Sequence, residues 1–160
     1  MPKGESGMKL LLWSLLLLAV IAAAIPAGAY WAGMDNAGGK PVPPDDISYT
    51  ESQAQEVWAN REQAFPIELR RITPWHFYHL VWCSRDDAHI EDYLSCGDQY
   101  PGLRAAGYVS KRFLVGHLKH EGLMWRYLSR TALTIWISRN WSEQQLVAEL
   151  IRLKHTPETG

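Results

Sequence analysis

The sequence has no stretch of alternating apolar and polar residues long enough to predict a β-strand. It also lacks a glycine-rich phosphate-binding loop, a nucleophile elbow, a haem-attachment motif and the paired cysteine and histidine motifs of zinc sites. Cysteine is scarce, with two residues in a chain of 160. These absences favour an all-α protein without a cofactor, and they remove the usual signatures of nucleotide-, haem- and zinc-dependent enzymes.

The two cysteines are Cys83 and Cys96. Two thiols without a second cysteine or histidine pair do not make a four-ligand zinc site, so we expect no metal. If the chain is exported to an oxidising compartment, the two are predicted to form a disulfide. In the chain-entropy model such a bridge stabilises the fold by about 3 kcal/mol.

The front of the chain carries the strongest signal. Leu10–Met34 is a run of 25 residues without a formal charge. At a rise of about 1.5 Å per residue, about 20 helical residues cross a hydrocarbon core, so the run is long enough to span. Lys3 and Lys9 precede it and Asp35 follows it. As an anchor, this bias keeps the short tail in the cytoplasm and sends the rest across.

A cleaved signal peptide is the competing interpretation. Pro26 and then Ala27-Gly28-Ala29 fit a small-x-small cleavage pattern, with the cut after Ala29. The aromatic pair Tyr30 and Trp31 instead suits the outer membrane–water interface, which favours the anchor. In both cases the functional part lies on the periplasmic, extracytoplasmic side, and with the anchor, which we favour, we expect an inner-membrane protein.

Three regions follow from composition. Residues 1–34 form the anchor or signal segment, and residues 35–48, rich in glycine and proline, form a linker. Residues 49–156 form one small helical domain. Thr50 or Ser52 is suited to cap its first helix, and Ser142 with Gln145 predicts a capping box on its last. The other predicted helices cover Pro74–Ser84, Ile90–Ser95, Leu103–Leu118 and Leu123–Arg139.

Charge is divided unevenly along the exported part. Residues 35–100 carry twelve acidic and five basic side chains, a balance of −7, whereas residues 101–160 carry four acidic and nine basic ones, a balance of +5. One interpretation is that two halves of one domain attract each other. The other is a basic face for an anionic ligand, such as a phosphate-bearing lipid or polymer. The near-neutral total and the export signal argue against nucleic acid.

The last two predicted helices carry a recognisable arrangement. Arg126 lies near the start of the longer helix, Ser142 in the following turn, and Leu146-Val147 near the start of the last helix. In this arrangement Met124–Arg152 resembles the family 51 peptidoglycan glycosyltransferases, the polymerase domains of bifunctional penicillin-binding proteins. The resemblance implies a lysozyme-like helical domain that handles cell-wall glycan behind a membrane anchor.

The chain departs from that family in ways that bear on activity. The family's glutamate after its Arg-Lys pair falls on Arg130, and its lysine falls on Tyr127. Its Gly-Ser-Thr-Ile-Thr-Gln-Gln signature is absent after Gly107, and its catalytic Glu-Asp motif has no clear counterpart. The resemblance therefore implies, at most, a peptidoglycan transglycosylase-like glycosyltransferase with reduced or no activity.

A cluster of carboxylates supplies the candidate catalytic residues. Glycosyl transfer needs a carboxylate as general base, and two carboxylates close together raise the pKa of one of them. The alternative interpretation is a solvated acidic loop. The candidates are Asp86, Asp87, Glu91 and Asp92.

Four basic residues supply the candidate ligand-binding site. Arg112, Lys119 and Arg126 are spaced by sevens, and Arg130 lies one helical turn further on. On one continuous helix they would line one face and cradle a phosphate or diphosphate, whereas Gly116 and Gly122 between them are suited to interrupt such a helix. The alternative is that they are surface residues with exposed charged ends, or partners of the acidic loop.

Two functions from different classes follow. The first is a membrane-anchored envelope protein with a degenerate peptidoglycan glycosyltransferase-like domain, which binds a lipid-linked precursor or polymeric cell-wall glycan. The second is a non-enzymatic, membrane-tethered scaffold that docks another envelope protein. Both place the lipid bilayer among the partners.

Overall fold

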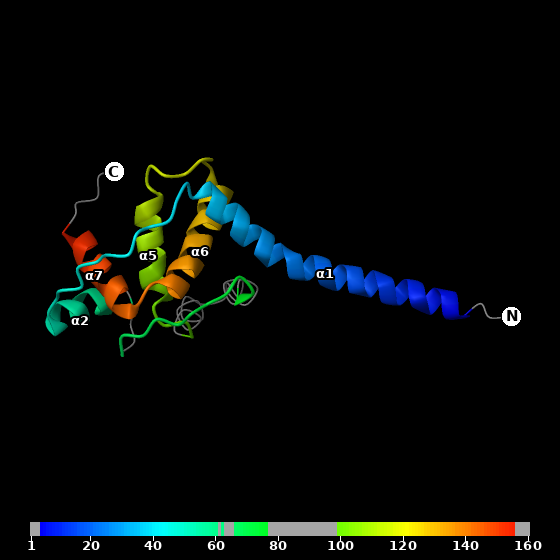
Figure 1. The fold of residues 1–160 in the computed structure, drawn as a ribbon, viewed down its shortest axis with the longest axis horizontal. Helices are drawn as coiled ribbons and strands as arrows, with labels where there is room; N and C mark the ends of the chain where they lie inside the picture. The colour runs from blue at the N-terminus through cyan, green and yellow to red at the C-terminus, as the bar shows by residue number, and fades with distance from the viewer. Residues whose placement is uncertain (1–3, 61, 63–65, 77–98, 156–160) are drawn as a thin grey trace, which may run out of the picture.

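A computed structural model describes residues 4–60, 62, 66–76 and 99–155. Within these ranges all regular secondary structure is helical, which confirms the predicted all-α class. The five helices of this part are α1 (Gly4–Asn36), α2 (Glu51–Ala59), α5 (Leu103–Leu114), α6 (Leu123–Asn140) and α7 (Glu143–Lys154). In Figure 1, α1 extends away from a cluster formed by the other four. The lysozyme-like arrangement stays a prediction.

The helix ends follow local sequence signals. Thr50 and Ser142 each accept a hydrogen bond from the backbone N–H three residues on, and the glutamine there accepts one from the N–H of the cap residue. The capping box predicted at Ser142 is confirmed, and of the two candidates for the first cap Thr50, not Ser52, occupies the position. The helix predicted over Leu103–Leu118 is shorter than expected. Val115 has an extended backbone, and Gly116 has a φ of +80°, a conformation that glycine adopts without strain. The chain therefore turns after Leu114.

α1 is a candidate membrane-spanning helix. Met8–Asn36 is long and apolar enough to cross a membrane, by length and composition alone. Its large apolar side chains from Met8 to Ile25 are exposed, from 49% at Ile21 to 70% at Trp13. Exposed apolar surface on this scale is unfavourable in water and favourable in hydrocarbon.

The last part of α1 is built into the domain. Gly33 lies against the α6 backbone, so that a Cβ on Gly33 would be 2.7 Å from the Leu128 carbonyl carbon. Asn36 is buried, and its Nδ2 donates to Ser129 Oγ at 2.9 Å. Its Oδ1 accepts from the His120 N–H at 2.8 Å. Packing and hydrogen bonds together fix α1 to α6.

The main core lies where α2, α5 and α7 meet the end of α6. Trp58 and Ile137 are fully buried in it, and Trp141 is 4% exposed. Burying side chains of this size supplies most of the driving force for folding. The remaining buried members are Ala54, Val57, Ala105, Ala106, Val109, Leu146, Val147 and Leu150.

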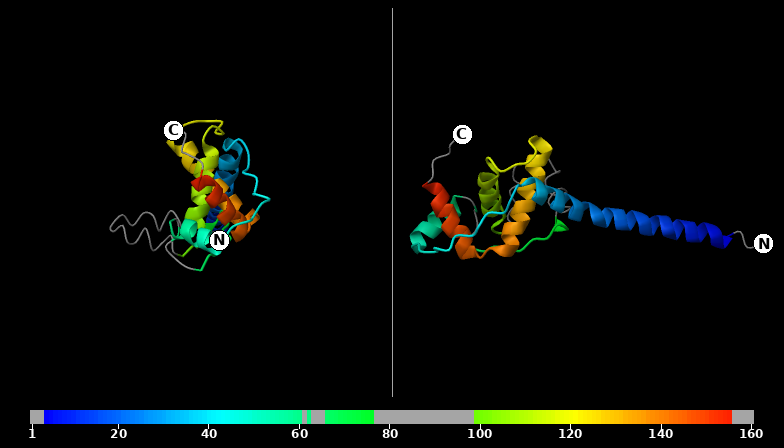
Figure 2. Two further views of the ribbon diagram at one scale, coloured as in Figure 1. Left: turned by 90° about the vertical axis from the view of Figure 1, so that its left-hand side faces the viewer. Right: turned by 45° about the horizontal axis from the view of Figure 1, so that its top comes forward.

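The segment between α1 and α2 has neither helix nor strand over residues 38–50. It runs along the domain beside α5 and α7, as the cyan trace in Figure 2 shows. Pro41 is buried, and the Lys40 Nζ lies 5.7 Å from the ring centroid of Trp136. This segment, predicted as a linker, therefore packs on the domain.

Candidate functional site

A cleft of about 600 Å³ opens between the end of α5, the connection after it and the first half of α6. We call it the α5–α6 cleft. Three basic side chains, one carboxylate and several apolar side chains line it together. Its lining residues are Lys111, Leu114, Val115, Gly116, Leu118, Glu121, Leu123, Arg126, Tyr127 and Arg130.

α6 brings Arg126 and Arg130 to the cleft because residues four apart lie on one helix face. The Arg130 Nε donates to the Gly107 carbonyl oxygen of α5 at 3.2 Å, which fixes one side of its guanidinium. Within the described ranges Arg126 makes no hydrogen bond or ion pair with a protein group. Its guanidinium is therefore available to a ligand.

α5 contributes the third cation, Lys111. The side chain of its neighbour Arg112 points about 100° further round the helix axis. Arg112 therefore lines a different groove, between the 38–50 segment, α5 and α7, with Asp45 and Asp46. The two helices that frame the α5–α6 cleft are also linked by a buried hydrogen bond, in which the Thr134 hydroxyl donates to Ser110 Oγ at 3.1 Å.

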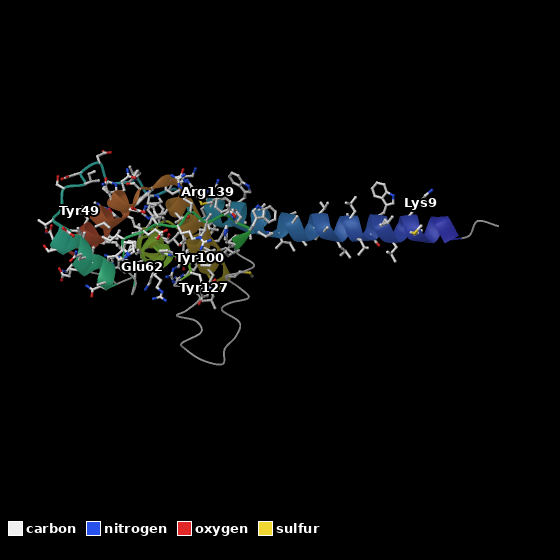
Figure 3. The ribbon with its side chains drawn as sticks, turned by 90° about the horizontal axis from the view of Figure 1, so that it is seen from below. Lys9, Tyr49, Glu62, Tyr100, Tyr127 and Arg139 are labelled. Atoms are coloured by element: carbon white, nitrogen blue, oxygen red, sulfur yellow. The ribbon has the colours of Figure 1, made fainter. Side chains whose placement is uncertain are left out.

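The wall and rim of the cleft are apolar and partly open to solvent. Leu123 is 74% exposed and Tyr127 is 61% exposed, whereas Leu114 is buried. Figure 3 shows Tyr127 on the side of the domain opposite to Arg139. A cleft with cations on one wall and exposed apolar groups on another fits a ligand that has both an anionic and an apolar part.

Lys119 does not join the other cations. Its Nζ donates to Asp35 Oδ1 at 2.7 Å, and both side chains are at least half exposed. An exposed pair of this kind contributes about 0–1 kcal/mol. Of the four basic residues singled out in the sequence, the structure therefore brings Arg126 and Arg130 together and separates Arg112 and Lys119 from them.

The predicted catalytic cluster and disulfide fall on residues 77–98, outside the part that the structure describes. The same holds for the helix predicted over Ile90–Ser95 and for most of that over Pro74–Ser84. All of these stay predictions. The residues concerned at the two sites are Asp86, Asp87, Glu91, Asp92, Cys83 and Cys96.

Glu62 is a buried carboxylate that the sequence interpretation missed. Its Oε1 accepts a hydrogen bond from the Ala105 N–H at 2.8 Å, across 43 residues of chain. The residue at the N-cap of α5 is Gly102, which has no side chain to cap the helix, so Glu62 supplies a cap. Burial raises the pKa of Glu62, while the backbone N–H groups of α5 and the charge of Arg104 act in the opposite direction. This carboxylate serves the fold.

Metal binding finds no support in the described ranges, where no group of three or more His, Cys, Asp or Glu side chains is placed to hold an ion. Glu121 is the one carboxylate among the described residues of the α5–α6 cleft. A single carboxylate beside three cations suits anion binding better than metal ligation.

Sequence reasoning missed Lys111 for an identifiable reason. The seven-residue spacing of the candidates would place them on one face only if a single helix covered residues 112–130, whereas the chain turns at Gly116 and Gly122, where φ is +80° and +124°. Two separate helices were predicted, over Leu103–Leu118 and Leu123–Arg139, but the sequence does not show which side of the first faces the second, and so does not distinguish Lys111 from Arg112.

No family model, curated protein or solved structure matches this chain.

Proposed function

We propose that this protein is anchored in the inner membrane by α1 and that its α5–α6 cleft binds a phosphate-bearing amphiphile on the extracytoplasmic side. A lipid-linked glycan precursor is the ligand we favour. The observation that carries the proposal is the convergence of Lys111, Arg126 and Arg130 on one cleft whose rim is formed by exposed Leu123 and Tyr127.

The charges of the cleft support an anion. Three cations face one carboxylate, Glu121, so the cleft has an excess of positive charge. Guanidinium groups donate paired hydrogen bonds to phosphate oxygens, and such charge-assisted bonds are about twice as strong as neutral ones. Arg130 is held from one side by Gly107, which reduces the entropy lost when it binds.

The resemblance to family 51 glycosyltransferases is consistent with this ligand class. The family's glutamate falls on Arg130, and Arg130 lines the cleft. A cation there adds to phosphate binding and supplies no general base. We therefore propose a degenerate relative that binds lipid-linked glycan and has reduced or no transferase activity.

A titration of the whole chain in lipid nanodiscs tests the proposal. Lipid-linked disaccharide-pentapeptide is the probe, and Arg126→Gln is the test variant. Removing a charged hydrogen bond costs about 1.5–3 kcal/mol, so we expect affinity to fall about tenfold or more. Arg71→Gln is the matched control, because Arg71 is exposed and does not line the cleft. Equal affinity of wild type and Arg126→Gln would refute the proposal.

Docking of an envelope protein is the second candidate. It is favoured by the first turn of α6, where Leu123 and Met124 are 74% and 72% exposed next to Tyr127. Exposed apolar groups in a row often mark a protein interface. Photo-crosslinking from position 124 in intact cells distinguishes the two: one recurrent protein adduct, lost in Tyr127→Ala and unaffected by Arg126→Gln, supports docking.

A further inference from the structure

A second cationic pocket lies where α1 enters the domain. Its volume is about 600 Å³, and we call it the junction pocket. The last turns of α1, the start of the 38–50 segment and the end of α6 form its walls. The residues that the argument uses are Tyr30, Trp31, Asp35, Lys40, Trp136 and Arg139.

The position of the junction pocket along α1 matches the headgroup layer. About 20 helical residues cross the hydrocarbon core, so a span that starts at Leu10 ends near Ala29. Tyr30 and Trp31 follow immediately, and Trp31 is 70% exposed. Aromatic side chains favour this interface because one part of the ring is apolar and another can bond to water or headgroups. The pocket therefore opens at the level of lipid phosphates.

Within the described part of the chain, the cations of the junction pocket have no carboxylate counter-ion, since neither Lys40 nor Arg139 makes a hydrogen bond or ion pair with a carboxylate. The one carboxylate among its described lining residues, Asp35, accepts from the Lys119 Nζ at 2.7 Å. Two cations are thus left to an external anion.

The cations are also held on a rigid framework. The Lys40 Nζ lies 5.7 Å from the ring centroid of Trp136, a cation–π distance that holds the ammonium near the pocket. Trp136 packs against the buried clusters of the domain. Arg139 follows three residues later on α6, so its backbone is fixed relative to Trp136.

We propose that the junction pocket binds the phosphate headgroup of an anionic phospholipid from the leaflet that contains the end of α1. Lys40 and Arg139 donate to the phosphate oxygens, and the acyl chains lie along the exposed apolar face of α1 near Ile21 and Ile25. Two cations without a counter-ion favour a lipid with net negative charge over a zwitterionic one. The proposal rests on the membrane anchoring by α1 given above, and it uses none of the residues of the α5–α6 cleft.

The experiment measures which lipids stay bound to the whole chain. The protein is reconstituted with equal amounts of phosphatidylglycerol and phosphatidylcholine, extracted in mild detergent, and the retained lipids are counted per chain by mass spectrometry. A basic residue near the membrane surface contributes about 1 kcal/mol, or about fivefold, toward anionic lipid. We expect Lys40→Gln and Arg139→Gln each to lower the preference for phosphatidylglycerol about fivefold.

Controls separate the possible sources of an effect. The variant Arg71→Gln removes one positive charge elsewhere, at an exposed residue outside the junction pocket, and should keep the preference. Millimolar inorganic phosphate should not displace the lipid, and displacement would indicate a free-phosphate site and overturn the lipid assignment. An unchanged preference in Lys40→Gln and Arg139→Gln, with wild-type circular dichroism, also overturns the proposal.

Two further outcomes distinguish this proposal from the function above. If alkaline extraction removes the chain from vesicles, α1 does not anchor it in the membrane. That result would refute both the membrane anchoring and the proposed headgroup site. We expect Arg126→Gln to lose binding of the lipid-linked glycan and to keep the preference for phosphatidylglycerol. This result would show that the α5–α6 cleft and the junction pocket bind their ligands independently. A simultaneous loss of both in Arg126→Gln contradicts the separate junction site.

Discussion

A methyl group added at Gly33 should loosen the contact between α1 and the domain. A Cβ there would lie 2.7 Å from the Leu128 carbonyl carbon and 2.9 Å from the Ala132 Cβ. Carbon atoms in good contact are about 3.5–4.0 Å apart, so α1 and α6 would have to separate by about 1 Å. The Leu128 atom belongs to the backbone and cannot rotate away.

The size of the effect follows from two opposing terms. Overpacking costs about 1–3 kcal/mol. Alanine in place of glycine inside a helix gains about 1 kcal/mol, and Gly33 does not have a positive φ that would prevent this gain. Because separation also strains the buried hydrogen bond from Asn36 to Ser129, at 2.9 Å, the upper part of the range applies. We expect Gly33→Ala to lower the free energy of unfolding by about 1–2 kcal/mol.

Gly28→Ala provides a control on the same helix. A Cβ on Gly28 would have no other atom within 4 Å, so only the gain in helix propensity remains. The assay is urea unfolding of the whole chain in detergent, followed by tryptophan fluorescence. We expect Gly28→Ala to be at least as stable as wild type and Gly33→Ala to be less stable. If Gly33→Ala equals or exceeds Gly28→Ala in stability, the close α1–α6 contact is refuted.

Three further predictions concern single polar groups. Burial raises the pKa of Glu62 above its ordinary 4.5, so its contribution to stability is fully present below pH 4.5 and is lost as pH rises through the folded-state pKa. The urea midpoint should therefore fall further between pH 4 and pH 7 for wild type than for Glu62→Gln. Equal decreases in the two proteins would contradict a raised pKa for Glu62. Ser142→Ala removes the α7 cap and should cost about 1 kcal/mol in thermal unfolding, whereas Ser142→Asp should restore it. Asn36→Ala leaves the His120 N–H without its bond and should cost about 2 kcal/mol in the same assay, and a cost under about 0.5 kcal/mol would show that water replaces the amide.

Local features of the fold could be predicted because neighbouring residues decide them. A helix cap depends on a side chain and a backbone N–H three residues away, so Ser142 was identifiable from sequence, and Thr50 was one of two candidates at the start of α2. The uncharged run Leu10–Met34 likewise gives a long apolar helix whatever surrounds it. The end of α5 was misplaced, because Gly116 is compatible with a continuing helix and with the turn that the structure contains.

The composition and order of side chains by themselves determined the all-α class, the apolar first helix, two helix caps and the presence of a basic C-terminal half. Only the tertiary structure decided which cations share a cleft. Lys111 and Arg112 are adjacent in sequence and lie on different sides of α5, while Arg126 and Arg130 meet Lys111 from another helix. Glu62 caps a helix 43 residues away. Such groupings depend on how helices pack against one another, and helix packing depends on contacts between residues that sequence spacing does not place side by side.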